Sequence, residues 1–456
     1  MIYTLVTGFL RLVTMIFFRQ IEVSGDQHIP PNQPIIFVGN HPNSLLDPVM
    51  IIAHATRRIS FAAKDTLFEY FPLRLIFSAL GAVPIRRKQD HQNKSALDNS
   101  SAFDALYQVL QNNGCMGIFP EGISHISSEL APLKTGAARI ALGVYKNLAP
   151  GQSLTIIPSG LTYKSRRRMR TSALVQFGAP ITIDANWQQK FMRDEKATTQ
   201  ELTALIDARL RALTINAPDF ETLRVLSTAR RIYQPENNTL SIEEHNLIMR
   251  RFVDHYERFK DEPHVRQIFS DLGAFQYEMD MAGITDHQLV HTQNNSRLWR
   301  KLFRHLVLCF CYLPLALPGL ILHFPILALA VFTGEGLSPR KDVIATTKMM
   351  SATFLVLLAY LLLPCIPLVF WPWPLGLYTA LYLLVFLPTT GWSTVRVLER
   401  QAFFRRGLGV WFKLLKNKEL LCYLQDERRR LQKAVQDLVD QYVDPALPRV
   451  VPKSEI

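Results

Sequence analysis

Residues 34–48 read PIIFVGNHPNSLLDP, a short apolar run that ends in a polar turn carrying His41 and Asp47. A continuous apolar run of this length, bounded by Pro34 and Gly39, predicts a buried strand. Residues 117–119, 154–158 and 173–177 have the same texture, whereas 100–112 and 135–146 are amphipathic and predict helices. Strands that alternate with helices predict an α/β domain with a mixed, largely parallel sheet flanked by helices.

The composition bounds the class of protein. The chain has 456 residues, of which 48% are hydrophobic and 20% charged, enough for two or three domains and too apolar for a disordered chain. Its five cysteines are few and odd in number, which argues against a disulfide scaffold and for a reducing compartment.

The net charge of +13 is compatible with nucleic acid, anionic lipid or phosphorylated substrates as partners. The apolar residues gather at the N-terminus and between 305 and 390, so we expect membrane lipids and no nucleic acid as partners. Residues 1–18 lack a cleavage site and predict an uncleaved helix on or shallowly in the membrane, with a buried core helix as the alternative.

Three further apolar runs, 305–333, 353–371 and 373–390, have the length of membrane segments. We therefore expect five parts: a membrane-associated helix at 1–24, the α/β domain at 25–185, a helical domain at 186–303, membrane-embedded hairpins at 304–392, and a basic amphipathic helical tail at 393–456. The tail suits an anionic membrane surface, with a solvated coiled segment as the alternative for 427–442.

The candidate chemistry lies where predicted strands end. His41 near neutral pH can take a proton from an alcohol, and Asp47 can orient its ring. Such a pair more often makes a simple loop hydrogen bond. Glu121 and Gly122, in the turn FPEGISH, offer a carboxylate and a close backbone approach to a ligand, or only a solvated turn.

Basic side chains form a second group. Arg86 and Arg87 follow the run GAVPI, and Lys134 stands at the start of a predicted helix. Guanidinium forks and helix N-termini suit phosphate, with a solvated basic loop as the alternative. Pro158 lies in the strand IIPSGLTY, which has no chemical specificity of its own.

Together and in this order, the four blocks resemble the motifs of the PlsC-type glycerolipid acyltransferase superfamily, over about residues 35–183. The stretches FPEGISH, GAVPIRR, Leu272-Gly273, Ile284–His287 and Asp342–Thr346 look most like its fungal-type glycerol-3-phosphate/dihydroxyacetone-phosphate branch, which has a membrane-embedded C-terminal half. The fold that the resemblance implies is a PlsC-like α/β acyltransferase domain with a helical membrane region.

The resemblance implies that His41 is the general base, that Asp47 orients it, and that the hydroxyl attacks an acyl thioester directly. It implies that Arg86 binds the acceptor phosphate, that Glu121 and Gly122 bind the glycerol backbone, and that Pro158 lines the site. Arg87, Ser124 and Lys134 are physical additions to the binding set. No metal site and no cofactor are expected; acyl-CoA or acyl-carrier protein is the co-substrate.

One departure concerns spacing. The superfamily has four residues between His and Asp, whereas His41 and Asp47 have five between them. Positions six apart do not share a face of an α-helix, so the pair needs a non-helical start, which Pro42 permits.

We expect acyl transfer to the sn-1 hydroxyl of glycerol 3-phosphate, with dihydroxyacetone phosphate as an additional acceptor. The alternatives are a lysophosphatidate or other lysophospholipid acyltransferase, and a non-catalytic lipid-binding protein. Basic clusters beside the apolar runs predict two membrane hairpins, at 305–333 and 353–390, with the catalytic domain on the cytoplasmic face. A bacterial inner membrane is favoured, with the endoplasmic reticulum as the alternative.

Overall fold

The computed structural model describes residues 2–86, 100–145, 148, 152–233, 240–291 and 295–442. Contacts divide the chain into two compact units. The first comprises residues 1–219, 240–250 and 339–346, and the second comprises 220–239, 251–338 and 347–456. We describe each unit by itself.

An eight-stranded sheet forms the centre of the first unit, in the order β1-β7-β6-β2-β5-β3-β4, with β8 paired to β6. The strands are β1 (Gln20–Ser24), β2 (Ile35–Gly39), β3 (Ile59–Lys64), β4 (Val83–Ile85), β5 (Cys115–Ile118), β6 (Leu154–Tyr163), β7 (Ser172–Phe177) and β8 (Ile181–Ile183). Strand β6 is parallel to β2 and antiparallel to β7 and β8. The predicted mixed, largely parallel sheet is confirmed.

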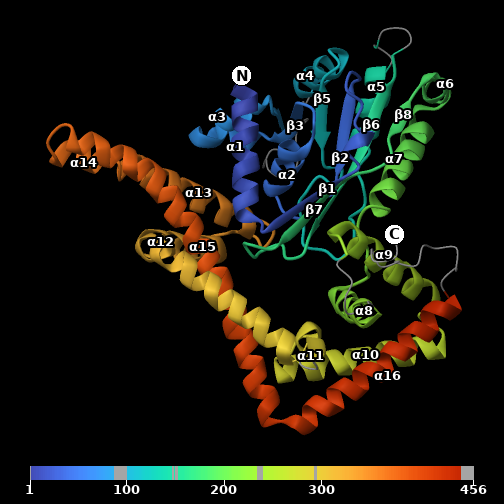
Figure 1. The fold of residues 1–456 in the computed structure, drawn as a ribbon. Helices are drawn as coiled ribbons and strands as arrows, with labels where there is room; N and C mark the ends of the chain where they lie inside the picture. The colour runs from blue at the N-terminus through green and yellow to red at the C-terminus, as the bar shows by residue number, and fades with distance from the viewer. Residues whose placement is uncertain are drawn as a thin grey trace. The chain divides into compact units, whose positions relative to one another are not determined.

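Helices cover both faces of this sheet (Figure 1). Successive side chains of β2 alternate between the faces, so Ile36 and Val38 join the core beneath α4 (Ser100–Gln111), α5 (Gly136–Tyr145) and α7 (Glu195–Arg211). Helices α1 (Ile2–Phe17) and α2 (Leu46–His54) lie on the opposite face. The remaining helical elements of this unit are η1 (Asp26–His28), η2 (Asp65–Glu69), α3 (Phe71–Leu80) and α6 (Ala185–Arg193).

Helix α1 packs on the first unit through one side and exposes the other. Leu10, Thr14 and Phe17 are buried, and the helix contacts α2 and α3. The opposite side exposes large apolar residues, namely Ile2, Leu5, Leu12, Met15 and Ile16. An apolar face left uncovered on a docked helix is what an interfacial membrane helix presents to lipid.

The second unit is helical. It contains α8 (Phe220–Tyr233), the second half of α9 (Ile242–Phe259), α10 (Pro263–Ala282), α11 (Asp286–His291), α12 (Asn295–Gly336), α13 (Ile344–Leu362) from residue 347 onward, α14 (Cys365–Phe370), α15 (Leu375–Lys416) and α16 (Lys418–Tyr442). Three stretches among the described residues are long and apolar enough to cross a membrane: Leu302–Gly336, Ile344–Phe370 and Leu375–Arg405. The protein is therefore membrane-associated.

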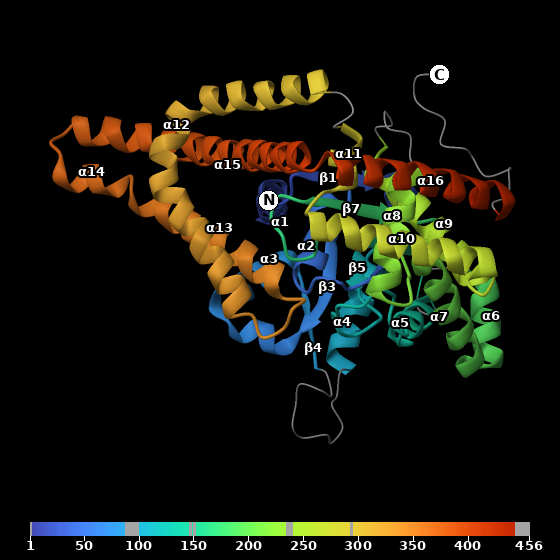
Figure 2. The same ribbon diagram turned by 90° about the horizontal axis from the view of Figure 1, so that it is seen from below.

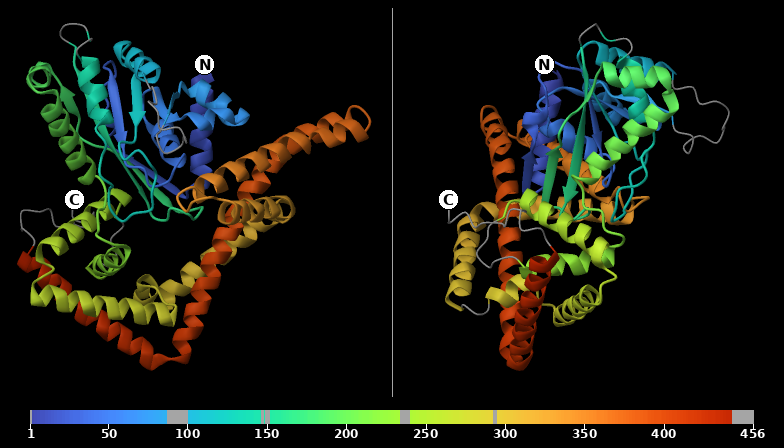
Figure 3. Two further views of the ribbon diagram at one scale, coloured as in Figure 1. Left: turned by 180° about the vertical axis from the view of Figure 1, so that it is seen from behind. Right: turned by 90° about the vertical axis from the view of Figure 1, so that its right-hand side faces the viewer.

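The two predicted hairpins, at 305–333 and 353–390, correspond to α12 and to the helices from α13 to α15. The chain turns between α14 and α15, at the predicted residues 371–374, so that the two arms form a hairpin (Figures 1 and 3). Residues 305–333, the predicted re-entrant pair, lie in one continuous helix, α12, that bends (Figure 2), and re-entry into the membrane stays a prediction. Proline removes a hydrogen bond and kinks a helix without ending it, and α12 contains Pro314, Pro318 and Pro325.

A buried polar cluster links α12, α13 and α15. The His323 ring nitrogen Nε2 lies 2.9 Å from the Tyr360 hydroxyl, which donates to the Leu387 carbonyl at 3.0 Å. The His323 nitrogen Nδ1 lies 2.8 Å from the Gly319 carbonyl. Polar groups in lipid must be satisfied within the protein, so this cluster fixes how the three helices pack.

The compact units differ from the five expected segments in two ways. Helices α6 and α7 pack on the first unit, because Leu202, Ile206 and Leu210 enter its core. The tail helix α16 does not present its apolar face to a membrane, because Leu424 and Leu431 are buried in a core shared with α8 and α10.

Candidate active site

The sequence motifs meet at one edge of the sheet. Strands β2, β5, β3 and β4 run parallel, so His41, Glu121 and Arg86 all follow the carboxyl ends of strands. His41 and Glu121 follow adjacent strands. Arg86 follows the edge strand β4, three strands from β2, which at about 4.8 Å per strand is roughly 14 Å between strand axes.

His41 and Asp47 form a pair. The His41 nitrogen Nδ1 lies 2.9 Å from the Asp47 oxygen Oδ2. The predicted non-helical start is confirmed, because α2 begins only at Leu46 and Ser44 has a φ of 51°. Helix α2 therefore begins four residues after Pro42. Asp47 lies in its first turn, and the loop before the helix brings it close to His41.

The Asp47 carboxylate is completely buried and accepts two further hydrogen bonds. The Asn43 backbone N–H donates to Oδ2 at 2.7 Å, and the Tyr163 hydroxyl donates to Oδ1 at 2.8 Å. Burial raises the pKa of Asp47, and the hydrogen bond from His41 opposes this rise. With Nδ1–H donating to Asp47, the His41 nitrogen Nε2 carries a lone pair and can act as a base.

Tyr163 is the third partner of the carboxylate. Burial and the nearby Asp47 charge raise the pKa of Tyr163 well above its ordinary value, so its hydroxyl stays protonated and remains a donor. Its ring stacks on Phe18, with centroids 5.7 Å apart, just after α1. The last residue of β6 and the residue that follows α1 therefore both support the His41–Asp47 pair.

Stacked rings hold the imidazole from its other side. The ring of His41 lies 4.2 Å from that of Phe119 at an interplanar angle of 7°, and Phe119 stacks on Phe61 at 5.4 Å. A side chain at Gly117 would place its Cβ 2.3 Å from the Phe61 ring, and one at Gly39 would lie 2.9 Å from Phe119. Glycine at both positions leaves room for the stacked rings of His41, Phe119 and Phe61, which belong to or follow the neighbouring strands β2, β5 and β3.

Glu121 joins the two catalytic loops. Its Oε1 accepts the His41 backbone N–H at 2.6 Å, and its Oε2 accepts the Ala131 N–H at 3.0 Å and pairs with the His125 ring. The side chain is buried, so all of these bonds form away from bulk solvent. Its binding of the glycerol backbone remains a prediction.

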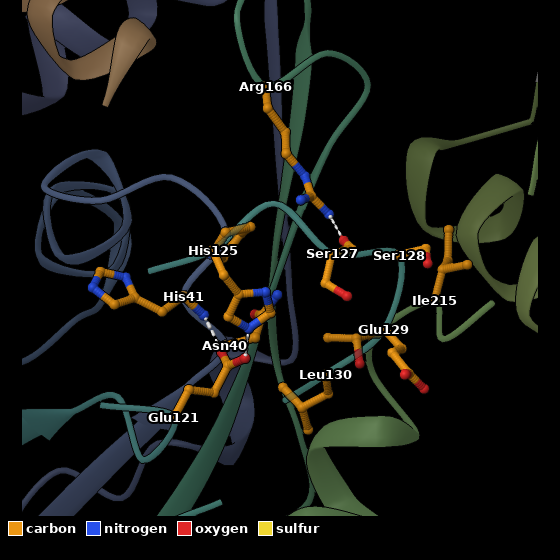
Figure 4. A pocket seen from close by; sticks show the side chains of 12 residues that line it. Asn40, His41, Glu121, His125, Ser127, Ser128, Glu129, Leu130, Arg166 and Ile215 are labelled. Atoms are coloured by element: carbon orange, nitrogen blue, oxygen red, sulfur yellow. Dashed lines mark hydrogen bonds and ion pairs between the residues drawn. The ribbon is translucent and has the colours of Figure 1, made fainter. Parts of the chain in front are cut away.

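A cavity lies beside these loops, lined by Asn40, His41, Glu121, His125, Ser128 and Arg166 among others. Figure 4 shows the backbone of His41 turned toward Glu121, while its imidazole points away from Glu121 and His125. Arg166 donates to the Ser127 carbonyl at 2.9 Å, and burial lowers the pKa of its guanidinium.

The other predicted binding residues lie as follows. Gly122 has a φ of +76°, and a Cβ there would lie 2.4 Å from the Lys134 Nζ, so the lysine packs over this turn. Pro158 is buried in β6 beside Val38. Arg86 is exposed and lies 3.9 Å from the Asp65 carboxylate, and Arg87 lies outside the described residues.

Cys115 is not a nucleophile of this site. It lies buried in β5, and burial raises the pKa of its thiol to about 11. A thiol with this pKa is protonated near neutral pH, which is unsuited to attack on an ester or thioester.

The structure adds residues that sequence reasoning did not assign to the site. Tyr163 ends the fourth motif, but nothing in that motif indicates a partner for Asp47. Asp342 accepts the Ser124 hydroxyl, and Thr346 donates to the Asn43 carbonyl at 3.3 Å. Both belong to the stretch Asp342–Thr346, whose resemblance to the fungal-type branch was the only available signal.

Two family models match the chain. Residues 20–162 match the acyltransferase model, and residues 225–447 match the model described as the glycerol-3-phosphate acyltransferase 2 C-terminal domain. The first contains the motifs around His41, Arg86 and Glu121, and the second contains the apolar helices.

Three fungal relatives are similar to this chain. Glycerol-3-phosphate O-acyltransferase 2 of Saccharomyces cerevisiae is 32% identical over 58% of this chain and 37% of its own length. Glycerol-3-phosphate O-acyltransferase 1 of the same yeast is 26% identical over 72% and 55%. An uncharacterised acyltransferase of Schizosaccharomyces pombe is 24% identical over 96% and 81%.

The chain thus spans about half the length or less of the two Saccharomyces cerevisiae proteins. The match to the Schizosaccharomyces pombe protein extends over both compact units. The sequence motifs, the α/β fold and the two family models agree: residues 20–162 match a PlsC-type acyltransferase domain, and residues 225–447 match the glycerol-3-phosphate acyltransferase 2 C-terminal domain.

Proposed function

We propose that this protein transfers a fatty acyl chain from acyl-CoA or acyl-carrier protein to the sn-1 hydroxyl of glycerol 3-phosphate. The product is lysophosphatidate, the precursor of phospholipids. The observation that carries the proposal is the His41–Asp47 pair, 2.9 Å apart, at the carboxyl end of the central strand β2. The names of the yeast relatives support the choice of acceptor.

The chemistry is a direct transfer. The His41 nitrogen Nε2 takes the proton of the acceptor hydroxyl as its oxygen attacks the thioester carbonyl. The carbon–oxygen bond forms, the carbon–sulfur bond breaks, and the leaving thiolate takes up the proton from the imidazolium. Asp47 holds the ring and stabilises its positive charge during the transfer.

We propose the binding roles on the same basis. Arg86 binds the acceptor phosphate with its guanidinium fork, and Glu121, Gly122 and Ser124 shape the turn that receives the glycerol backbone. Arg87 and Lys134 add positive charge, and Pro158 lines the floor of the site. Because Arg86 follows the edge strand, this role requires its side chain and the acceptor together to span the distance from β4 to His41.

Purified protein in lipid nanodiscs, given labelled acyl-CoA or acyl-carrier protein and a panel of acceptors, tests the function. We expect acylation of glycerol 3-phosphate. If lysophosphatidate were acylated and glycerol 3-phosphate were not, the lysophospholipid acyltransferase alternative would replace the proposal. Lipid binding without turnover of any acceptor would identify a non-catalytic member of the family.

The His41→Ala variant tests the general base. We expect it to remain folded and to lose roughly 100- to 10,000-fold in kcat, the usual contribution of a positioned acid–base group. His264→Ala is the matched control, because His264 is exposed on α10. Retention of more than a few per cent of activity by folded His41→Ala would contradict the mechanism.

The Arg86→Lys variant tests the phosphate contact. Lysine keeps the charge but loses the forked geometry, so KM for glycerol 3-phosphate should rise about tenfold, the equivalent of one charge-assisted hydrogen bond. KM for the acyl donor should not change. Arg74→Lys, on the exposed side of α3, is the control. An equal rise in both constants would indicate a general loss of structure instead.

We propose that both membrane segments enter and leave at the same face. Residues 240–250 and 339–346 belong to one compact unit, and α12 is the candidate crossing between them in the described chain. One straight crossing would separate its two ends. Bent at its prolines, the apolar part of α12 gives two arms of about 17 residues, short of the roughly 20 needed to span.

The second membrane segment, residues 347–417, also begins and ends at the same face in this proposal. Helix α16 packs on α8, and α8 is flanked in sequence by parts of the first unit. The chain from 347 to 417 must therefore return to its starting face, which the hairpin of α13–α14 and α15 accomplishes with two passes. Basic residues flank these segments, which favours the cytoplasmic face for the acyltransferase unit, in a bacterial inner membrane or the endoplasmic reticulum. They are Arg297, Arg300, Lys301, Arg304, Arg340, Lys341, Lys348, Arg396, Arg400, Arg405 and Arg406.

Thiol labelling tests this topology. In a variant whose five cysteines are replaced, Gly336→Cys should react with an impermeant reagent from the same side as Lys196→Cys, an exposed position on α7. Both should be labelled from the cytoplasmic side. Labelling of Gly336→Cys only from the opposite side would show that α12 crosses once.

A further inference from the structure

Residues 339–346, here called the connector, comprise most of the loop after α12 and the start of α13, and they belong to the acyltransferase unit. Residues 339–346 group with that unit, although the chain on either side of them groups with the other. Asp342 and Thr346 are 5% and 2% exposed, so this short connector is anchored by polar side chains that are almost completely buried. Buried polar groups of this kind are costly unless they have hydrogen-bond partners.

The first anchor is on the FPEGIS loop. The Ser124 hydroxyl donates to the Asp342 carboxylate, and Arg340 donates to the same carboxylate at 2.9 Å and to the Ser124 oxygen at 3.1 Å. Ser124 precedes His125, whose backbone N–H donates to the His41 carbonyl at 3.2 Å. The Asp342 carboxylate is therefore connected to the backbone of His41, the proposed base, through Ser124 and the neighbouring His125.

The second anchor is on the loop that carries the base itself. The Thr346 hydroxyl donates to the Asn43 carbonyl at 3.3 Å. The backbone N–H of Asn43 donates to the Asp47 carboxylate, and Asn43 is almost completely buried. Thr346 thus holds the same residue that helps fix the orienting carboxylate.

We infer that Asp342 and Thr346 are positioning residues of the active site, and that the connector sets the geometry between the His41 loop and the Glu121 loop. This inference rests on the proposed function. Both loops are irregular over the residues concerned. They contact each other through the side chain of Glu121, the backbone of His125 and the stacked rings of His41 and Phe119, and the connector adds a separate hydrogen bond to each loop. A displacement of about 1 Å in a reacting group can cost on the order of 100-fold in rate.

The inference gives the C-terminal half a role in catalysis. The connector lies within the span matched by the C-terminal domain model, and it is covalently continuous with the two helices α12 and α13. The active site is therefore completed by residues about 220 to 300 positions away from the motifs that they support. Neither positioning residue contacts the imidazole directly.

Single substitutions at Thr346 and Asp342 test the two anchors. Thr346→Val keeps the shape of the side chain and removes the donor, and Asp342→Ala removes the acceptor of Ser124 and Arg340. We expect each to lower kcat by about 10- to 100-fold, with KM for both substrates changed less than threefold. Thr346→Ser should restore the rate, and Lys341→Gln, on the exposed side of the connector, should leave it unchanged.

A double-mutant cycle identifies the partner. If Asp342 acts through Ser124, the double variant Ser124→Ala/Asp342→Ala should be no slower than the slower single variant, because both remove one interaction. Wild-type kcat in Thr346→Val and Asp342→Ala, or a lower melting temperature with unchanged kcat, would overturn the positioning role.

Cross-linking separates this inference from the proposed function. A Ser124→Cys/Asp342→Cys variant, without the natural cysteines, should form a disulfide within one chain on mild oxidation, whether or not the protein turns over. If the variant forms the link and the wild-type protein acylates no acceptor, the proposed function alone is refuted. If the wild-type protein is active and the variant does not form the link, the connector's role alone is refuted.

Discussion

The buried Asp47 carboxylate is the constraint on which the site depends. A buried charge without partners costs several kcal/mol, so its oxygens must be matched by donors. The donors come from the loop after β2 and from the end of β6, which lie side by side in the sheet. Satisfying one carboxylate therefore fixes the start of α2 against β6 and leaves the Nε2 of His41 as the free base.

Much of this could be predicted from the sequence, because it is locally determined. Apolar runs ending in polar turns indicated a largely parallel sheet, and placed the candidate chemistry at the ends of strands. The five-residue spacing between His41 and Asp47 correctly required a non-helical loop, since positions six apart do not share a helix face. The backbone of Ser44, with positive φ, makes that loop compact.

The remainder depends on contacts between distant residues, which periodicity cannot reveal. Tyr163 is 116 positions from Asp47, Ser124 is 218 from Asp342, and Asn43 is 303 from Thr346. The tail helix was misjudged for the same reason. An amphipathic pattern with basic residues fits a lipid surface and a protein surface equally well, and in α16 the buried pair Arg428–Asp286 and the apolar core favour protein.

The proposed positioning role relates the C-terminal half of the chain to catalysis. Residues 339–346 group with the acyltransferase unit, whereas the chain on either side of them enters helices long and apolar enough to cross a membrane. Buried polar groups such as Asp342 and Thr346 are costly unless they have partners, and their partners lie on the loops that follow β5 and β2. On the proposed function, the segment that positions the His41 loop also joins two apolar helices, which is a physical reason for the acyltransferase motifs and the C-terminal helices to occur in one chain.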